Sequence, residues 1–277
     1  MFNVPSFFGF KAGSEPPDPD ALAFFARVDT ATGVSDYLTL TQKSAVDTLV
    51  KKMKTDGIWT NLKAAYPMVG GGNGTLAQNQ AACEQNLVSA SFTGAFSSGW
   101  TFASTGATPN GSTAFFNTTL NPNAELLQDS CHLSFYSRTN NAQSTSIEIG
   151  SLSLSPNLFF HFHTYYTFPT FLALLAQNAV AGVTVANSLG FSNGNRTSSI
   201  RVSNFKNGVN LGDTSATSVT LTSQPVYVGA GNINGSPSNY SNRECAFASI
   251  GFGLTDTQAA NFYNAVQAFQ TTLSRQV

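Results

Sequence analysis

Charged residues are scarce in this sequence of 277 amino acids. Only 10% of the residues are Asp, Glu, Lys or Arg, and the formal net charge is −1. A chain without excess positive charge lacks the basic surface that attracts nucleic-acid phosphates, so we predict no nucleic-acid partner. Since ionic groups are few, the surface must be built from Ser, Thr, Asn and Gly, which is typical of a robust protein that faces the extracellular medium.

Cysteines and long apolar runs are also scarce. Cys83, Cys131 and Cys245 are too few and too scattered for a disulfide scaffold or a zinc site. Pairing of Cys131 with Cys245 across a sheet stays open, with buried free thiols as the default expectation. The longest apolar stretch, 168–176, is too short to span a bilayer, and the N-terminus lacks a secretory signal pattern. We therefore predict no membrane insertion, and synthesis in a cytoplasm without a signal peptide.

The first residues of the chain are rich in phenylalanine. Phe2, Phe7, Phe8 and Phe10 make this segment too apolar for a free tail, so it should cover a surface of its own domain or of a partner. The proline-rich stretch that follows predicts a stiff linker. We assign residues 1–17 as an attachment segment with its linker.

Residues 18–69 show helical patterns. Apolar residues recur at helical spacing, and Asp18 or Asp20 can cap the first helix because a short acidic side chain accepts hydrogen bonds from free backbone N–H groups. The expected helices run from Asp18 or Asp20 to Val28, from Thr41 to Gly57, and from Ile58 towards Pro67.

Beyond residue 70 the pattern changes to short β-favouring runs that polar turns separate. Such spacing predicts an antiparallel sandwich or barrel rather than βαβ units. Asn207 and Gly208 lie between two such runs and predict a tight hairpin, since both readily adopt positive φ. Residues 168–181 fit either a helix or a strand. The other expected strands are 98–103, 113–118, 132–137, 146–149, 158–166, 200–205, 219–221, 226–228 and 246–250.

The chain closes with the clearest helix signal. Thr255 and Gln258 have the spacing of a capping box, in which each side chain bonds the backbone of the other. Phe262, Val266 and Phe269 then lie on one helical face, together with a leucine one turn later.

Two of these patterns occur together in a known fold. The hairpin at 205–208 is followed by Pro-Val-Tyr-Val-Gly at 225–229, and the last strand runs into the capped helix across 247–259. This arrangement resembles the C-terminal half of a laminin-G-like, concanavalin A-type jelly roll. With the segments 54–59, 66–70, 100–112 and 267–275, the whole layout is similar to virion-surface proteins encoded in tailed-phage and prophage genomes.

The resemblance implies a mainly β fold, with a concanavalin A-like jelly-roll sandwich and its C-terminal helix at 70–277 preceded by the small helical segment. It also implies a non-enzymatic structural protein on the virion surface, a fibre or decoration component. The N-terminal region would attach the chain to other virion proteins, and the jelly roll would face outward. Such appendages are usually symmetric, so we expect a homo-oligomer.

An alternative function stays open, a carbohydrate-binding tail-fibre tip or adhesin whose main role is host attachment. The candidate ligand loops are 187–199 and 229–243. The second loop has amide groups that suit sugar hydroxyls, a ring for stacking and a cation. Its candidate ligand-binding residues are Asn232, Asn234, Asn239, Tyr240 and Arg243.

Catalytic and metal sites are poorly supported by the sequence. Glycan cleavage needs two carboxylates facing each other across a groove, and Glu148, expected to point away from its flanking isoleucines, has no partner at a suitable spacing. His161 and His163 lie on one face of an expected strand, about 7 Å apart by strand geometry. A metal needs a third ligand, and His132 is the remaining histidine. We predict no catalytic residue, no metal and no cofactor.

Overall fold

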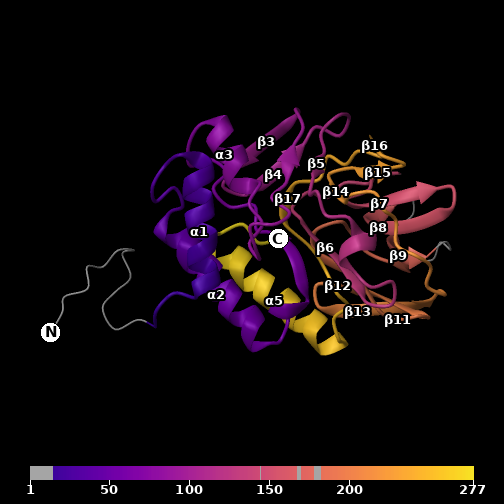
Figure 1. Ribbon diagram of the computed structural model, residues 1–277. Helices are drawn as coiled ribbons and strands as arrows, with labels where there is room; N and C mark the ends of the chain where they lie inside the picture. Colours follow the sequence, from indigo (N-terminus) through magenta and orange to yellow (C-terminus); the bar gives the residue numbers. More distant parts are fainter. Residues whose placement is uncertain (1–14, 144, 167–169, 178–181) are drawn as a thin grey trace.

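The computed structural model describes residues 15–143, 145–166, 170–177 and 182–277. Two β-sheets pack face to face as a sandwich, and helices from both ends of the chain cover one side of it (Figure 1). The predicted fold class, a mainly β antiparallel sandwich with helices before and after it, is confirmed. The predicted attachment residues Phe2, Phe7, Phe8 and Phe10 lie outside the described residues.

The first sheet has eight strands in the described part of the chain, all paired antiparallel. In spatial order its strands are β13 (Val209–Ser215), β12 (Arg201–Lys206), β11 (Gly190–Ser198), β6 (Cys131–Ser137), β17 (Cys245–Gly251), β4 (Gly106–Pro109) and β3 (Trp100–Ala103), and β1 (Leu62–Tyr66) also pairs with β17.

The second sheet has nine strands among the described residues. In spatial order they are β10 (Val183–Thr184), β9 (Thr170–Gln177), β8 (Asn157–Tyr166), β7 (Ile149–Leu154), β14 (Tyr227–Val228), β5 (Phe116–Asn117) and β2 (Ala95–Phe96), with β15 (Gly231–Ile233) parallel to β7 and β16 (Ser236–Ser238) antiparallel to β15.

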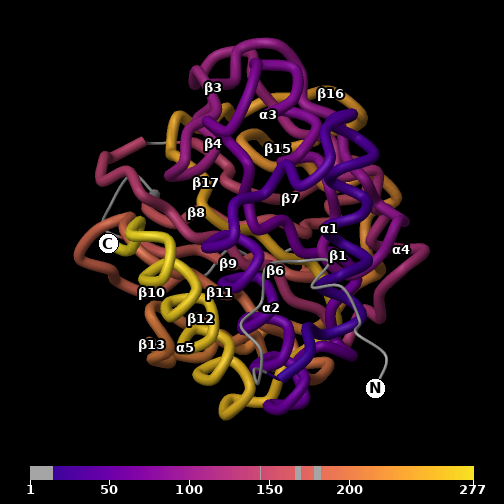
Figure 2. The backbone as a smooth tube through the Cα atoms, turned by 90° about the vertical axis from the view of Figure 1, so that its left-hand side faces the viewer, coloured from indigo at the N-terminus to yellow at the C-terminus, as the bar shows by residue number. Residues whose placement is uncertain are grey.

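Helices α1 (Pro19–Thr32), α2 (Leu40–Thr55) and α5 (Asp256–Thr272) gather on the outer side of the first sheet. The shorter helices are α3 (Leu76–Cys83), which packs on α1, and α4 (Pro122–Glu125), and η1 (Trp59–Asn61) is a 3-10 turn. The indigo α2 and the yellow α5 lie side by side (Figure 2). No helix of the described residues is long and apolar enough to cross a membrane.

Two hydrophobic clusters hold these layers together. Between the sheets, Phe135 of β6 packs with Phe160 and Phe162 of β8, and all three are buried. Outside the first sheet, the Phe262 ring of α5 meets the rings of Phe191 and Phe247 edge-on at 5.2 and 5.8 Å. Burying aromatic surface on both faces of the first sheet fixes α5 against it.

Several local predictions are confirmed. Asp18 caps α1, and the side chains of Thr255 and Gln258 form the expected capping box of α5. Asn207 and Gly208 join β12 to β13 with φ values of 48° and 77°. The three cysteines are buried and free.

Other predictions are wrong. Leu62–Tyr66 is strand β1 instead of helix, because pairing with β17 satisfies its backbone and buries most of its side chains. The choice between helix and strand left open at 168–181 is settled for 170–177, which form β9, with alternate side chains facing the core of the sandwich and the outside. The strand expected at 146–149 begins only at Ile149, and residues 219–221 form no strand.

The domain boundary predicted at residue 70 stays a prediction, but packing is continuous across it. One hydrophobic cluster joins Phe25 of α1 and Val46 of α2 to Phe269 of α5. Gly70 and Gly71 at this boundary are buried, and an added Cβ at Gly71 would lie 2.4 Å from the carbonyl oxygen of Ala103.

Candidate functional site

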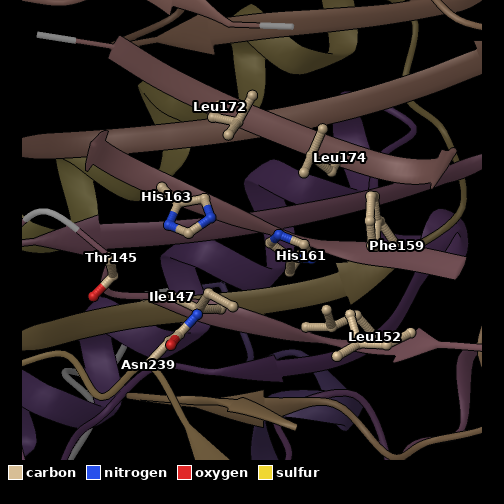
Figure 3. Close-up of a pocket in the computed structure, with 10 residues that line it drawn as sticks. Thr145, Ile147, Leu152, Phe159, His161, His163, Leu172, Leu174 and Asn239 are labelled. Carbon is tan, nitrogen blue, oxygen red and sulfur yellow. The ribbon is translucent and has the colours of Figure 1, made fainter. Parts of the chain in front are cut away.

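A pocket of about 240 Å³ opens on the outer face of the second sheet, across β7, β8 and β9 (Figure 3). We call it the outer pocket. Its lining residues are Thr145, Ile147, Leu152, Leu154, Phe159, His161, His163, Leu172, Leu174 and Asn239.

Strand alternation explains why these residues face outward. In β8, Phe160 and Phe162 enter the core, so Phe159, His161 and His163 project from the opposite face. Leu172 and Leu174 alternate in the same way along β9, which pairs with β8. The register places leucine and imidazole side chains on neighbouring strands, and together they form one concave, largely apolar surface.

A glycine on the neighbouring strand leaves room for His161. Gly150 of β7 pairs with His161 of β8 and has φ of +145°. A Cβ at this position would lie 2.2 Å from the Cβ of His161. Any other residue at position 150 would therefore displace the histidine.

The two imidazoles lie at the centre and at one end of the pocket. Their ring centroids are 5.2 Å apart and nearly perpendicular. His163 Nδ1 donates to the backbone carbonyl of Ser146 at 2.5 Å, which orients the ring. His161 Nδ1 is buried and has no hydrogen-bond partner among the described residues, and the residue as a whole is only 5% exposed.

Burial keeps both imidazoles neutral at ordinary pH. Loss of hydration lowers the pKa of His161 well below its usual value, and the neighbouring His163 lowers it further. Loss of hydration also lowers the pKa of His163, against the opposing effects of the Glu148 carboxylate and of the hydrogen bond to Ser146.

A buried ion pair supports the polar end of the pocket. Arg243 Nη1 donates to Glu148 Oε1, and both side chains are fully buried. The same guanidinium donates to the Oγ atom of Ser146 at 2.9 Å and to the backbone carbonyl of Tyr165 at 3.1 Å. Glu148 Oε2 accepts from the backbone N–H of Thr164 at 2.6 Å. The pair thus ties the segment before β7 to the end of β8, where His163 lies.

These contacts bear on the prediction that Arg243 binds a ligand from its loop. Arg243 does not project from the loop, because its guanidinium is buried and pairs with Glu148 inside the protein. Asn232 is buried as well, and its Nδ2 donates to the backbone carbonyl of Pro225 at 2.9 Å. A direct ligand contact by Asn232 or Arg243 is therefore not supported.

The remaining predicted ligand residues lie in different places. Asn239 lines the outer pocket, and its backbone carbonyl accepts a hydrogen bond from the backbone N–H of Ile147. Tyr240 is half-buried and donates from its hydroxyl to the carbonyl of Pro237 at 3.1 Å. Asn234 is exposed, with its Oδ1 accepting from the N–H of Leu154 at 3.0 Å. The loop expected at 187–199 is mostly strand β11.

Sequence reasoning missed the apolar residues of the pocket. Phe159 and His161 were visible as alternate positions of one expected strand, but the leucines of β7 and β9 join them only through strand pairing. The sequence offered His161 and His163 either as metal ligands or as solvent-facing or cross-strand polar residues, and not as part of an apolar pocket. No group of three His, Cys, Asp or Glu residues able to hold a metal occurs in the part of the chain that the structure describes.

Comparison with known proteins identifies no family. No family model matches the chain, and no curated protein matches it. Domain 4 of AbnA, a GH43 extracellular arabinanase from Geobacillus stearothermophilus in complex with arabinotriose, is 11% identical with a TM-score of 0.42, over 73% of this chain and 98% of that domain. A Trypanosoma rangeli sialidase is 11% identical with a TM-score of 0.45, over 80% of this chain and 39% of its own.

The CBM40 of a Ruminococcus gnavus IT-sialidase has a TM-score of 0.35 and 12% identity, and the match covers 47% of this chain and 79% of that module. TM-scores this low support no argument about the present chain. The assignment of the fold therefore depends on the strand pairing and packing described above.

Proposed function

We propose that this chain is a non-enzymatic binding protein that holds a carbohydrate residue in the outer pocket. The observation that carries this proposal is a concave, largely apolar surface that brings together two neutral imidazoles, an aromatic ring and an amide. Sugars combine apolar C–H faces with hydroxyl groups that both donate and accept. Phe159 suits the C–H face of a sugar, and His161 and Asn239 suit its hydroxyl groups.

The lining of the pocket supports binding without catalysis. Glycoside hydrolysis uses two carboxyl groups on either side of the scissile bond. None of the described residues that line the outer pocket is Asp or Glu. The nearby Glu148 is engaged by Arg243, Ser146 and Ser241 through one oxygen and by Thr164 through the other.

A glycan-binding experiment tests this function. The full chain should bind members of a glycan array, and Phe159→Ala should weaken that binding at least about tenfold, because the C–H face loses its aromatic partner. Phe115→Ala is the matched control, since Phe115 is also half-buried but stacks on Tyr227 away from the pocket. Equal binding by wild type and Phe159→Ala, with both folded, would contradict the proposal.

We propose the surface of a phage particle as the setting, with other virion proteins and further copies of this chain as partners. The similarity of the sequence layout to virion-surface proteins supports this proposal. Attachment would involve residues 1–17, which include Phe2, Phe7, Phe8 and Phe10. Deleting residues 1–17 in the encoding genome should remove the chain from purified particles, as measured by mass spectrometry. Undiminished incorporation would refute this mode of attachment.

A further inference from the structure

The outer pocket has two chemically different ends. Thr145, His163 and Asn239 lie at one end, Leu152 and Phe159 lie at the other, and His161 lies between them (Figure 3). The aliphatic lining is completed by Ile147, Leu154, Leu172 and Leu174, and Ile147 and Leu172 lie beside His163 (Figure 3). A ligand that fills the pocket can therefore place hydrogen-bonding groups at the end with His163 and Asn239, and an apolar group at the end with Leu152 and Phe159.

The pocket also lacks charge of either sign. None of its ten lining residues is Lys, Arg, Asp or Glu, and burial keeps the two imidazoles neutral. The ion pair beside the pocket joins Glu148 to Arg243. Both side chains are fully buried, and their charges neutralise each other. A carboxylate that entered the pocket would lose hydration without gaining a cationic partner.

The volume limits the size of the ligand. About 240 Å³ is less than the range of roughly 300–1,000 Å³ that is usual for drug-sized ligands. A single sugar ring, with the rest of the glycan outside, is a suitable occupant.

We propose that the outer pocket selects uncharged 6-deoxyhexose residues, whose C6 methyl group packs among the leucines while the ring hydroxyls reach His161 and Asn239. This inference rests on the proposed glycan-binding function and defines its substrate class. The parent hexose places a hydroxyl, and the uronate a carboxylate, where the 6-deoxyhexose has its methyl group. Both substituents lose hydration against aliphatic side chains, and the charged one loses more.

Matched sugars that differ only at C6 test this selectivity. Methyl glycosides of the 6-deoxyhexose, the hexose and the hexuronate, each in the gluco, galacto and manno series, are titrated into the full chain at pH 7 by calorimetry. In each series that binds, the 6-deoxyhexose should bind more tightly than the hexose and at least about tenfold more tightly than the uronate. A uronate that binds as tightly as its 6-deoxyhexose, or a parent hexose that binds more tightly, overturns the inference and leaves the glycan-binding function intact. Absence of binding by every sugar overturns both.

A charge placed at the rim gives an independent test. Leu154 lines the pocket and is 52% exposed, so Leu154→Lys should fold normally. At low ionic strength this variant should bind the uronate about threefold more tightly than wild type does. Leu127→Lys is the control, because Leu127 is similarly exposed at 63% but does not line the pocket. If folded Leu154→Lys binds the uronate no more tightly than wild type does, the lack of a cation in the pocket is not the reason why the uronate binds weakly.

Discussion

At the scale of residues, this protein places several of its few charged groups inside. Arg196, Arg243 and Arg275 are at most 1% exposed. Arg196 Nε donates to the carbonyl of Leu175 at 2.7 Å, and Arg275 Nη1 donates to the carbonyl of Met68 at 2.8 Å. A guanidinium carries five donors, so it can satisfy several backbone carbonyls that would otherwise be buried without partners.

Breaking the buried ion pair should cost much more than breaking an exposed one. Arg243→Met leaves the Glu148 carboxylate buried without its cation and should lower the free energy of unfolding by about 3–5 kcal/mol. Arg201→Met is the control, because Arg201 is 33% exposed and its pairs with Asp213 and Asp256 are screened by water, so the loss should be at most about 1 kcal/mol. Urea denaturation at pH 7 measures both, and equal losses would contradict the argument.

Buried histidines predict how stability depends on pH. Burial lowers the pKa of His132 to about 4 and also lowers the pKa values of His161 and His163. The unfolded chain takes up protons near pH 6.5 and the folded chain does so only at lower pH. The contribution of these histidines to the free energy of unfolding is therefore fully present above about pH 6.5. It falls as the pH drops from there towards 4, by up to about 1.4 kcal/mol per pH unit for each histidine.

Urea denaturation between pH 7 and pH 4.5 measures this slope. His161→Phe should make the slope shallower, because the variant has one group fewer that protonates only on unfolding. An unchanged slope in His161→Phe would show that His161 does not contribute to it.

At the scale of elements, α5 depends on both its cap and its packing. The Thr255 side chain accepts from the N–H of Gln258, and Gln258 in turn accepts from the N–H of Thr255. One turn further, Phe262 packs on Phe191 and Phe247 of the first sheet. The cap determines where α5 begins, and that start places the aromatic face over the sheet.

Loss of the cap should be measurable without loss of the fold. Thr255→Ala removes the acceptor for the N–H of Gln258 and should lower the free energy of unfolding by about 1 kcal/mol. Thr271→Ala, an exposed change near the end of α5, should have a smaller effect. Thermal unfolding of both variants gives the comparison, and equal effects would contradict a special role for the cap.

At the scale of the whole molecule, the two ends of the chain stabilise each other. α2 packs on α5, and β1 pairs with β17 in the first sheet. Near the C-terminus, Arg275 Nη2 donates to the backbone carbonyl of Pro67 at 2.6 Å. The first sheet is therefore completed by residues from the segment that the sequence assigned to a separate helical unit.

This packing predicts the behaviour of a truncated chain. Residues 70–277 alone lack β1, α1 and α2, so the fragment exposes Phe269 and other apolar residues of the outer cluster. The full chain should unfold in one cooperative transition, whereas the fragment should lose its near-ultraviolet circular dichroism and bind a hydrophobic dye. A fragment that unfolds as sharply, at the same temperature, would show that the N-terminal segment is dispensable for the fold.

Local sequence signals predicted local structure well. The cap at Thr255, the hairpin at Asn207 and Gly208, and the alternation within β8 are each encoded within a few neighbouring residues. The overall class of sandwich followed from many short strands without intervening helices. Asn239 of the predicted ligand loop lines the outer pocket, but the composition of that loop says nothing of which of its side chains turn inward.

The sequence by itself determined the class of fold, the N-terminal caps of α1 and α5 and the uncharged character of the surface, since these depend on composition and on near neighbours. Only the tertiary structure decided that Leu62–Tyr66 is a strand, that Arg243 pairs with Glu148, and that leucines of two strands meet His161 in one pocket. Strand partners and charge partners are separated by many residues, about 95 for Arg243 and Glu148. Their meeting depends on the register of whole sheets, which local preferences do not specify.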